Sequence, residues 1–178
     1  MKRLAIISVL STALAAPLAA RAEPIQAVLT GFEEVPMVST LATGEFRGVI
    51  THDDQFIDYE FAYRGLQGSV TQAHIHIAQK NVSGGIVVWL CGTGEPGTQF
   101  AGPEGTPPCT PGSGSFTGTI RADDVVVPPG STGAQQITAG ELGEVIAAMR
   151  AGAAYVNVHT SLSLPGEIRG QIRASRRP

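Results

Sequence analysis

Alternation of apolar and polar residues runs through most of the chain and predicts β-strands. It is clearest over residues 56–64, where Ile57, Tyr59, Phe61 and Tyr63 share one face and Asp58, Glu60 and Arg64 share the other. Because successive side chains of a strand point to opposite faces, the segment predicts a strand with one buried face. Further strands are predicted over residues 25–29, 43–50, 72–77, 86–90, 115–121, 155–160 and 167–172. Polar and glycine-rich turns separate them, which favours antiparallel hairpins.

One segment has a helical period instead. Its apolar residues recur at i, i+3, i+4 and i+7, at Leu142, Val145, Ile146 and Met149. Thr138 and Glu141 have the spacing of a capping box, and Gly152 suits the end of a helix. The sequence therefore predicts a mainly β protein, an antiparallel Greek-key-like β-sandwich or barrel, with one short helix near residues 139–151.

The beginning of the chain has the pattern of an export signal. Lys2 and Arg3 precede an apolar run over residues 4–18, and Ala20-Arg21-Ala22 has the small-x-small form of a cleavage site. We expect a signal peptide over residues 1–22 and a single domain over residues 23–178, exported to a periplasm or secreted. Without residues 1–22 the formal charge falls from -3 to about -6, which argues against a nucleic-acid partner. No later segment is apolar for the roughly 20 residues that a membrane span needs.

The two cysteines, Cys91 and Cys109, are expected to form a disulfide, because disulfides persist in oxidising compartments. The alternative is two free, buried thiols. Between them the composition changes to Gly, Pro, Thr and Ser, and residues 92–114 are too long for an ordinary connection. We expect a surface loop that the disulfide ties at its base.

Two histidines lie two residues apart on the predicted strand over residues 72–77. His74 and His76 project from one face, while Ala73, Ile75 and Ile77 face the core. The imidazoles then lie on the outer face of the sheet, where only loops or side chains of a neighbouring strand can cover them. This arrangement suits copper or zinc.

A third histidine, His159, lies in the last predicted hairpin. If the turn over residues 164–166 sets its register, His159 opposes Glu167, Asn157 opposes Arg169, and Tyr155 opposes Gln171. The candidate metal ligands are therefore His74, His76 and His159, for one copper or zinc ion, with Glu167 orienting His159 and with Asn157 and Arg169 beside them.

Each of these candidates has a simpler interpretation. The three histidines could hydrogen-bond to Tyr155, Asn157 and Glu167 and only fix strand pairing. For Glu167 and Arg169, a cross-strand ladder with Asn157 and Gln171 is favoured over a role at a metal. His52 lies in a polar turn and is expected to be solvated. Asp123 and Asp124 are expected to form a turn, because no calcium loop surrounds them. No nucleophile elbow or phosphate-binding loop is present.

Several motifs resemble the chordin-type (CHRD) domain family. They are residues 73–77 (Ala-His-Ile-His-Ile), 155–160 (Tyr-Val-Asn-Val-His-Thr), 165–172 (Pro-Gly-Glu-Ile-Arg-Gly-Gln-Ile) and the opening residues 29–36 (Leu-Thr-Gly-Phe-Glu-Glu-Val-Pro). The resemblance covers about residues 25–173 and implies an exported β-sandwich, of a family also found in extracellular antagonists of growth-factor signalling. It implies no known catalytic activity. The segment over residues 92–114 is longer than the family leads us to expect.

A weaker resemblance concerns the His-x-His strand, which is similar to the copper-binding strands of the copper/zinc superoxide dismutase fold. Since His52 is the only other histidine, a histidine-bridged pair of metals cannot be built here. The first hypothesis is a non-enzymatic extracytoplasmic binding module whose partner is a protein or one metal ion. The alternatives are a copper-dependent redox enzyme of superoxide dismutase type, in which Arg169 steers an anion, and a purely structural or protein-interaction domain.

Overall fold

The computed structural model describes residues 22–95, 98–127, 133 and 135–175. The predicted signal peptide, except Ala22, lies outside the described residues. Nine strands form one antiparallel sheet, in the order β5-β4-β7-β8-β1-β2-β3-β6, with β9 paired to β1. The strands are β1 Glu23–Thr30, β2 Thr43–Ile50, β3 Ile57–Arg64, β4 Val70–Ile77, β5 Gly85–Gly92, β6 Gly114–Ile120, β7 Ala154–Thr160, β8 Ile168–Gln171 and β9 Arg173–Ala174.

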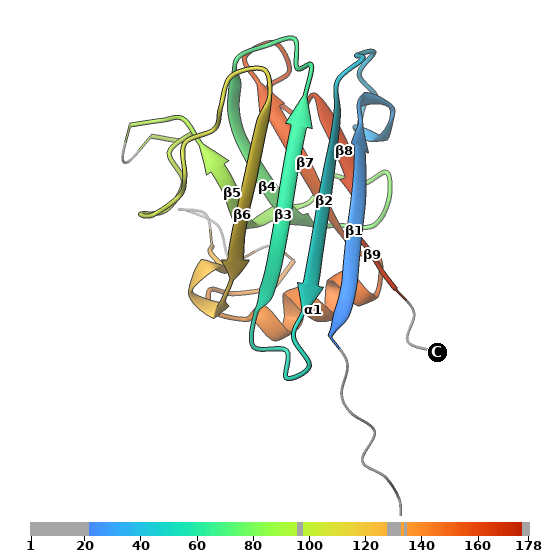
Figure 1. The fold of residues 1–178 in the computed structure, drawn as a ribbon, viewed down its shortest axis with the longest axis vertical. Helices are drawn as coiled ribbons and strands as arrows, with labels where there is room; N and C mark the ends of the chain where they lie inside the picture. Colours follow the sequence, from blue (N-terminus) through green and yellow to red (C-terminus); the bar gives the residue numbers. More distant parts are fainter. Residues whose placement is uncertain (1–21, 96–97, 128–132, 134, 176–178) are drawn as a thin grey trace, which may run out of the picture.

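The sheet curls into a nearly closed barrel of two layers. In Figure 1, β6, β3, β2 and β1 lie side by side in front, and β5, β4, β7 and β8 cross behind them. The ends of the strand order approach each other after β6, where Val126 N donates to Val87 O at 2.9 Å. The predicted fold class, mainly antiparallel β with one short helix, is confirmed.

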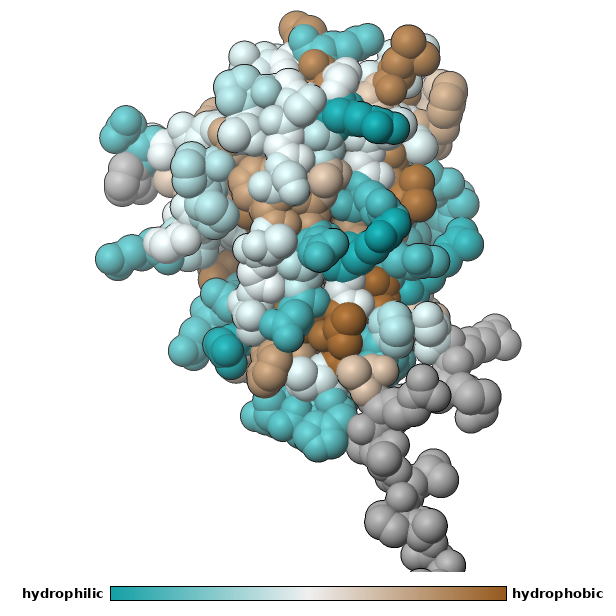
Figure 2. Space-filling model, viewed as in Figure 1, coloured by the Kyte–Doolittle hydropathy of each residue, from teal (hydrophilic) through white to brown (hydrophobic). Residues whose placement is uncertain are grey.

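The core fills the space between the two layers. It consists of the inward residues of alternating strands, such as Leu29, Phe46, Phe61, Ile75 and Val156, each at most 1 % exposed. The strand β2 pairs with β3 along its whole length, so the predicted hairpin is confirmed. Figure 2 shows the face of the front layer that points away from the core. This outer face is mostly hydrophilic, with scattered apolar side chains.

The helix α1, Leu142–Arg150, lies across the lower end of the barrel (Figure 1). Its four predicted apolar residues are buried there. It begins three residues later than predicted, and only half of the capping box forms: Thr138 N donates to Glu141 Oε2 at 2.7 Å, but no side chain caps the first turn. Gly152, with φ +68°, follows the helix as predicted, because this left-handed conformation is free of strain for glycine.

Two 3₁₀ turns and a long loop complete the fold. The turns are η1, Gly31–Glu33, and η2, Ala122–Asp124. The predicted disulfide between Cys91 and Cys109 is confirmed, and it closes the loop that leaves β5. Among the described residues, no helix is long and apolar enough to cross a bilayer.

Candidate functional site

The strands β4 and β7 place the three histidines on one face of the back layer. Gln72 pairs with His159, His74 with Asn157, and His76 with Tyr155. Because β4 alternates, its odd-numbered neighbours Ala73 and Ile75 enter the core and are fully buried. The predicted parity is therefore confirmed: the histidines point away from the core.

This outer face is covered, and the cover buries the histidines. His74 is 0 %, His76 6 % and His159 7 % exposed. The ring of Trp89, from the neighbouring strand β5, stands edge-on to His74 with centroids 4.2 Å apart, and Tyr155 stacks on His76 at 4.7 Å. Turns over residues 78–84 and 161–166 close over the rings. The histidines therefore lie in a buried polar region that is separated from the hydrophobic core by the back layer of the sheet.

Backbone carbonyls of these turns fix two of the rings. His159 Nδ1 lies 2.7 Å from Leu164 O, and His76 Nδ1 lies 3.0 Å from Gly84 O. A carbonyl oxygen only accepts, so each Nδ1 carries the hydrogen and each Nε2 of the neutral ring keeps its lone pair. Both rings are therefore held in the tautomer that can bind a metal through Nε2.

The nitrogens of the three rings converge. His74 Nδ1 lies 3.3 Å from His159 Nε2, and one ligand atom from each histidine lies within 4.8 Å of the other two. The Nε2 atoms of His74 and His76 are buried, and no described residue forms a hydrogen bond with either of them. Three nitrogens bound tetrahedrally at about 2.0–2.1 Å from a metal lie about 3.3–3.4 Å apart. The widest pair, at up to 4.8 Å, would have to approach by about 1.4 Å to match this geometry.

Burial keeps the three rings neutral. It lowers the pKa of His76 to about 3, since a protonated His159 would also repel a charge on this ring, and it lowers the pKa of His74 and of His159 as well. Neutral imidazole is the form that ligates metals. The cluster thus consists of three neutral imidazole rings, which could together hold one metal ion.

The predicted register of the last hairpin is confirmed, with Asn157 opposite Arg169 and Tyr155 opposite Gln171. The side chain of Asn157 lies at the cluster, with Oδ1 3.0 Å from His159 Nε2. The Arg169 guanidinium lies over the Tyr155 ring at 3.5 Å and is 2 % exposed. Its Nη2 donates to Gln79 O at 3.3 Å and to Gln171 Oε1, on the same strand, at 3.4 Å.

The described hydrogen bonds of Glu167 are made with groups other than the histidines. Its oxygens accept from four donors, Thr40 Oγ1, Gln67 N, Gly68 N and Thr160 Oγ1, at 2.8–3.4 Å. These bonds fasten the turn before β4 and the segment before β2 to the hairpin. The described partners of His159 are instead Leu164 O, Asn157 and His74.

Sequence reasoning missed Glu34, which lies at the edge of the same interior. It is 8 % exposed, and among the described residues no donor lies within hydrogen-bonding geometry of its Oε1. Burial raises its pKa to about 7, against the opposing charge of Arg169. Oε1 lies against Gly166, which has φ +136°, beside the amide of Asn157. The carbonyls of Gly84 and Leu164 were missed too, because backbone groups leave no mark in a residue pattern.

Other candidates lie apart from this cluster. The His52 side chain is 60 % exposed, as expected for a solvated residue. Asp123 and Asp124 belong to η2, where Asp124 Oδ2 accepts from Arg121 N at 2.8 Å, so they form a turn.

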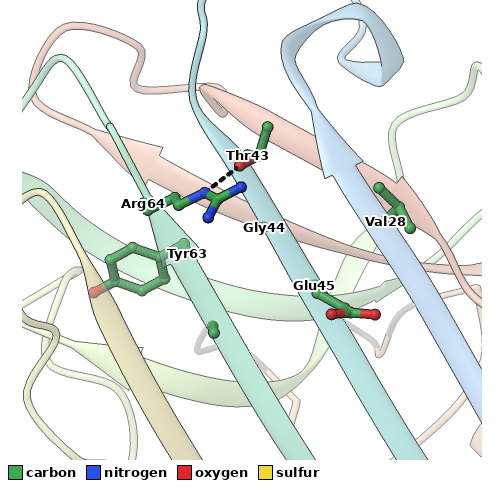
Figure 3. Close-up of a pocket in the computed structure, with 7 residues that line it drawn as sticks. Val28, Thr43, Gly44, Glu45, Tyr63 and Arg64 are labelled. Carbon is green, nitrogen blue, oxygen red and sulfur yellow. Dashed lines mark hydrogen bonds between the residues drawn. The ribbon is translucent and has the colours of Figure 1, made fainter.

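A depression of about 440 Å³ lies on the front layer, lined by Val28, Thr43, Gly44, Glu45, Ala62, Tyr63 and Arg64. Figure 3 shows Arg64 reaching across it, where its Nε donates to Thr43 Oγ1 at 3.2 Å. No histidine lines this depression. It therefore offers less chemistry than the buried histidines.

The protein is thus a small, nearly closed antiparallel β-barrel. Its three buried histidines form a polar site on the outer face, covered by turns. The chain belongs to the CHRD domain family, whose model matches residues 25–172 and so covers all three histidines. No curated protein and no solved structure matches the chain.

Proposed function

We propose that this protein is an exported CHRD-domain binding module that holds one copper or zinc ion through His74, His76 and His159. The observation that carries the proposal is the convergence of three buried, neutral imidazoles, two of which are set to the metal-binding tautomer by Leu164 O and Gly84 O. Hydrogen-bonded ring nitrogens opposite the ligating ones are typical of metal-binding histidines.

A purely structural role for the histidines explains less. A histidine that only fixes strand pairing uses its ring nitrogens in hydrogen bonds, but His74 Nε2 and His76 Nε2 are buried and have none. Each such buried polar atom costs about 1–3 kcal/mol. A metal ion would use one lone pair from each ring, and imidazole nitrogen suits both copper and zinc.

Export is supported by two features that are independent of the site. Residues 1–22 have the pattern of a signal peptide, and the two cysteines are joined in a disulfide. Residues 23–178 would then form the single mature domain.

The superoxide dismutase-like alternative has less support. It needs a cation near the metal that attracts an anionic substrate from solvent. Arg169 is 2 % exposed and is occupied by Tyr155, Gln79 and Gln171. A guanidinium held in this way supports the fold of the outer face rather than steering ions.

The test is metal uptake by the purified, chelator-stripped protein, measured by calorimetry and by elemental analysis after gel filtration. We expect one Cu²⁺ or Zn²⁺ per chain, and we expect His74→Ala, His76→Ala and His159→Ala each to abolish stoichiometric uptake. His52→Ala is the matched control and should bind as the unmodified protein does. An unmodified protein that takes up no stoichiometric metal would refute the proposal. Consumption of superoxide by the copper-loaded protein, lost in His74→Ala, would favour the enzyme instead.

A further inference from the structure

We infer that Asn157 supplies the fourth ligand of this ion through its side-chain oxygen Oδ1, so that the coordination shell is closed. The inference rests on the proposed function, since it concerns the same ion. It changes what the site can do: an ion with four protein ligands is retained, whereas a catalytic ion keeps one position open for water or substrate.

The first argument is a contact between two acceptors. His159 Nδ1 carries the ring hydrogen, because it lies 2.7 Å from Leu164 O. The lone pair of His159 Nε2 therefore faces Asn157 Oδ1, which is 3.0 Å away and is also an acceptor. Nothing between these two atoms carries a hydrogen in the neutral ring. A cation placed beside both atoms removes this repulsion and uses both lone pairs.

The second argument is the orientation of the amide. Asn157 Nδ2 points to the other side, where Pro165 O lies 3.5 Å away and Glu34 Oε1 approaches across Gly166. Both of these groups accept hydrogen bonds. Turning the amide over would place Oδ1 against these two acceptors and Nδ2 at the histidines. One contact between two acceptors would then be replaced by two such contacts. The surroundings therefore hold Oδ1 towards the cluster.

The third argument is position. Asn157 is paired directly with His74 across β4 and β7, and it precedes His159 by two residues on the same face. Its side-chain oxygen lies 3.0 Å from His159 Nε2, so this short side chain lies at the cluster. Three imidazole nitrogens and one side-chain oxygen complete four ligands, the number that zinc takes in closed tetrahedral sites.

The test uses Co²⁺ as a visible probe for the zinc-like site, with azide as a small competing ligand. An open position holds an exchangeable water, which azide replaces and thereby changes the Co²⁺ absorption spectrum. We expect the Co²⁺ spectrum of the unmodified protein to be insensitive to azide. Asn157→Ala should still bind Co²⁺ through the three histidines, with affinity lowered at least about tenfold, and its spectrum should respond to azide.

Two further variants make the result decisive. Gln171→Ala is the matched control, because it removes an amide from the same face whose described donations go to Ala78 O and Gly152 O, away from the histidines. It should behave as the unmodified protein does. Asn157→Asp keeps an oxygen donor, so it should bind Co²⁺ at least as tightly and stay insensitive to azide, which decides the question if Asn157→Ala does not fold.

The outcomes separate this inference from the proposed function. An unmodified protein that binds Co²⁺ but changes its spectrum with azide, or an Asn157→Ala variant with unchanged affinity and spectrum, overturns the fourth ligand and leaves the three-histidine site standing. An azide-sensitive Asn157→Asp overturns it as well. An unmodified protein that binds neither Co²⁺ nor Zn²⁺ overturns both proposals.

Discussion

Replacing Glu34 by glutamine should stabilise the metal-free protein at neutral and alkaline pH. The carboxyl group is buried, with 8 % of the residue exposed. Burial therefore raises its pKa from the ordinary 4.5 to about 7, although the nearby charge of Arg169 acts in the opposite direction. Glutamine is neutral at every pH and keeps an oxygen in the same place.

The sign and size of the effect follow from proton linkage. Below pH 4.5 the carboxyl is neutral in both the folded and the unfolded chain, so it causes no loss of stability. Between pH 4.5 and about 7 the unfolded chain loses this proton while the folded chain retains it, which lowers the free energy of unfolding by about 1.4 kcal/mol per pH unit. The loss reaches about 3 kcal/mol near pH 7 and is constant above that.

The assay is urea unfolding of the unmodified protein and of Glu34→Gln at several pH values between 4.5 and 8. We expect the difference in their free energies of unfolding to grow by about 3 kcal/mol in favour of the variant across this range. Glu33→Gln is the control, because Glu33 forms only an exposed ion pair with Lys80, at 3.1 Å, worth less than about 1 kcal/mol. If the profiles of Glu34→Gln and the unmodified protein stay parallel, the carboxyl is not buried as described.

Three further outcomes are expected. In the metal-free protein, protonation of His76 on unfolding should cost about 3 kcal/mol between pH 6.5 and pH 4, so the free energy of unfolding of His76→Leu should rise by about 3 kcal/mol relative to that of the unmodified protein as the pH falls across this range in urea titrations. Replacing Cys91 and Cys109 by alanine should lower the free energy of unfolding by about 3 kcal/mol, and added reductant should then have no further effect on urea unfolding. Gly166→Ala should lower the melting temperature, because φ is +136° and the new Cβ would lie 2.9 Å from Asn157 Nδ2.

The strands and their faces could be predicted because alternation is a local property. The side chains of β3, β4 and β7 alternate in the sequence as they do in the sheet, and the register expected from a turn over residues 164–166 is the one that the last hairpin has. The three histidines could therefore be grouped before their distances were known. The start of α1 was predicted three residues too early, because the end of a helix depends on capping hydrogen bonds that only partly form.

The environment of the histidines could not be predicted. Alternation places them outside the hydrocarbon core, but their burial depends on turns that arrive from distant parts of the chain. Leu164 O and Gly84 O act through the backbone, so any residue type at those positions could supply them. Glu34 comes from the segment after η1, far from the histidines in sequence, and only the folded chain brings it against Gly166. The register alone suggested that Glu167 orients His159. Register determines which residues are neighbours, but it does not determine which hydrogen bonds they form.

The way in which the site is assembled bears on how an ion would behave there. The sheet supplies the ligands, but the turns over residues 78–84 and 161–166 supply the bonds that orient two rings and the cover that excludes water. An ion can then enter or leave only when a turn opens, which breaks the bond that orients His76 or His159. Binding should therefore stabilise these turns by mass action, and exchange of the ion should be slow. Slow exchange and a covered site suit a module that keeps its ion as part of its structure, rather than a centre that must admit a new substrate at each turnover.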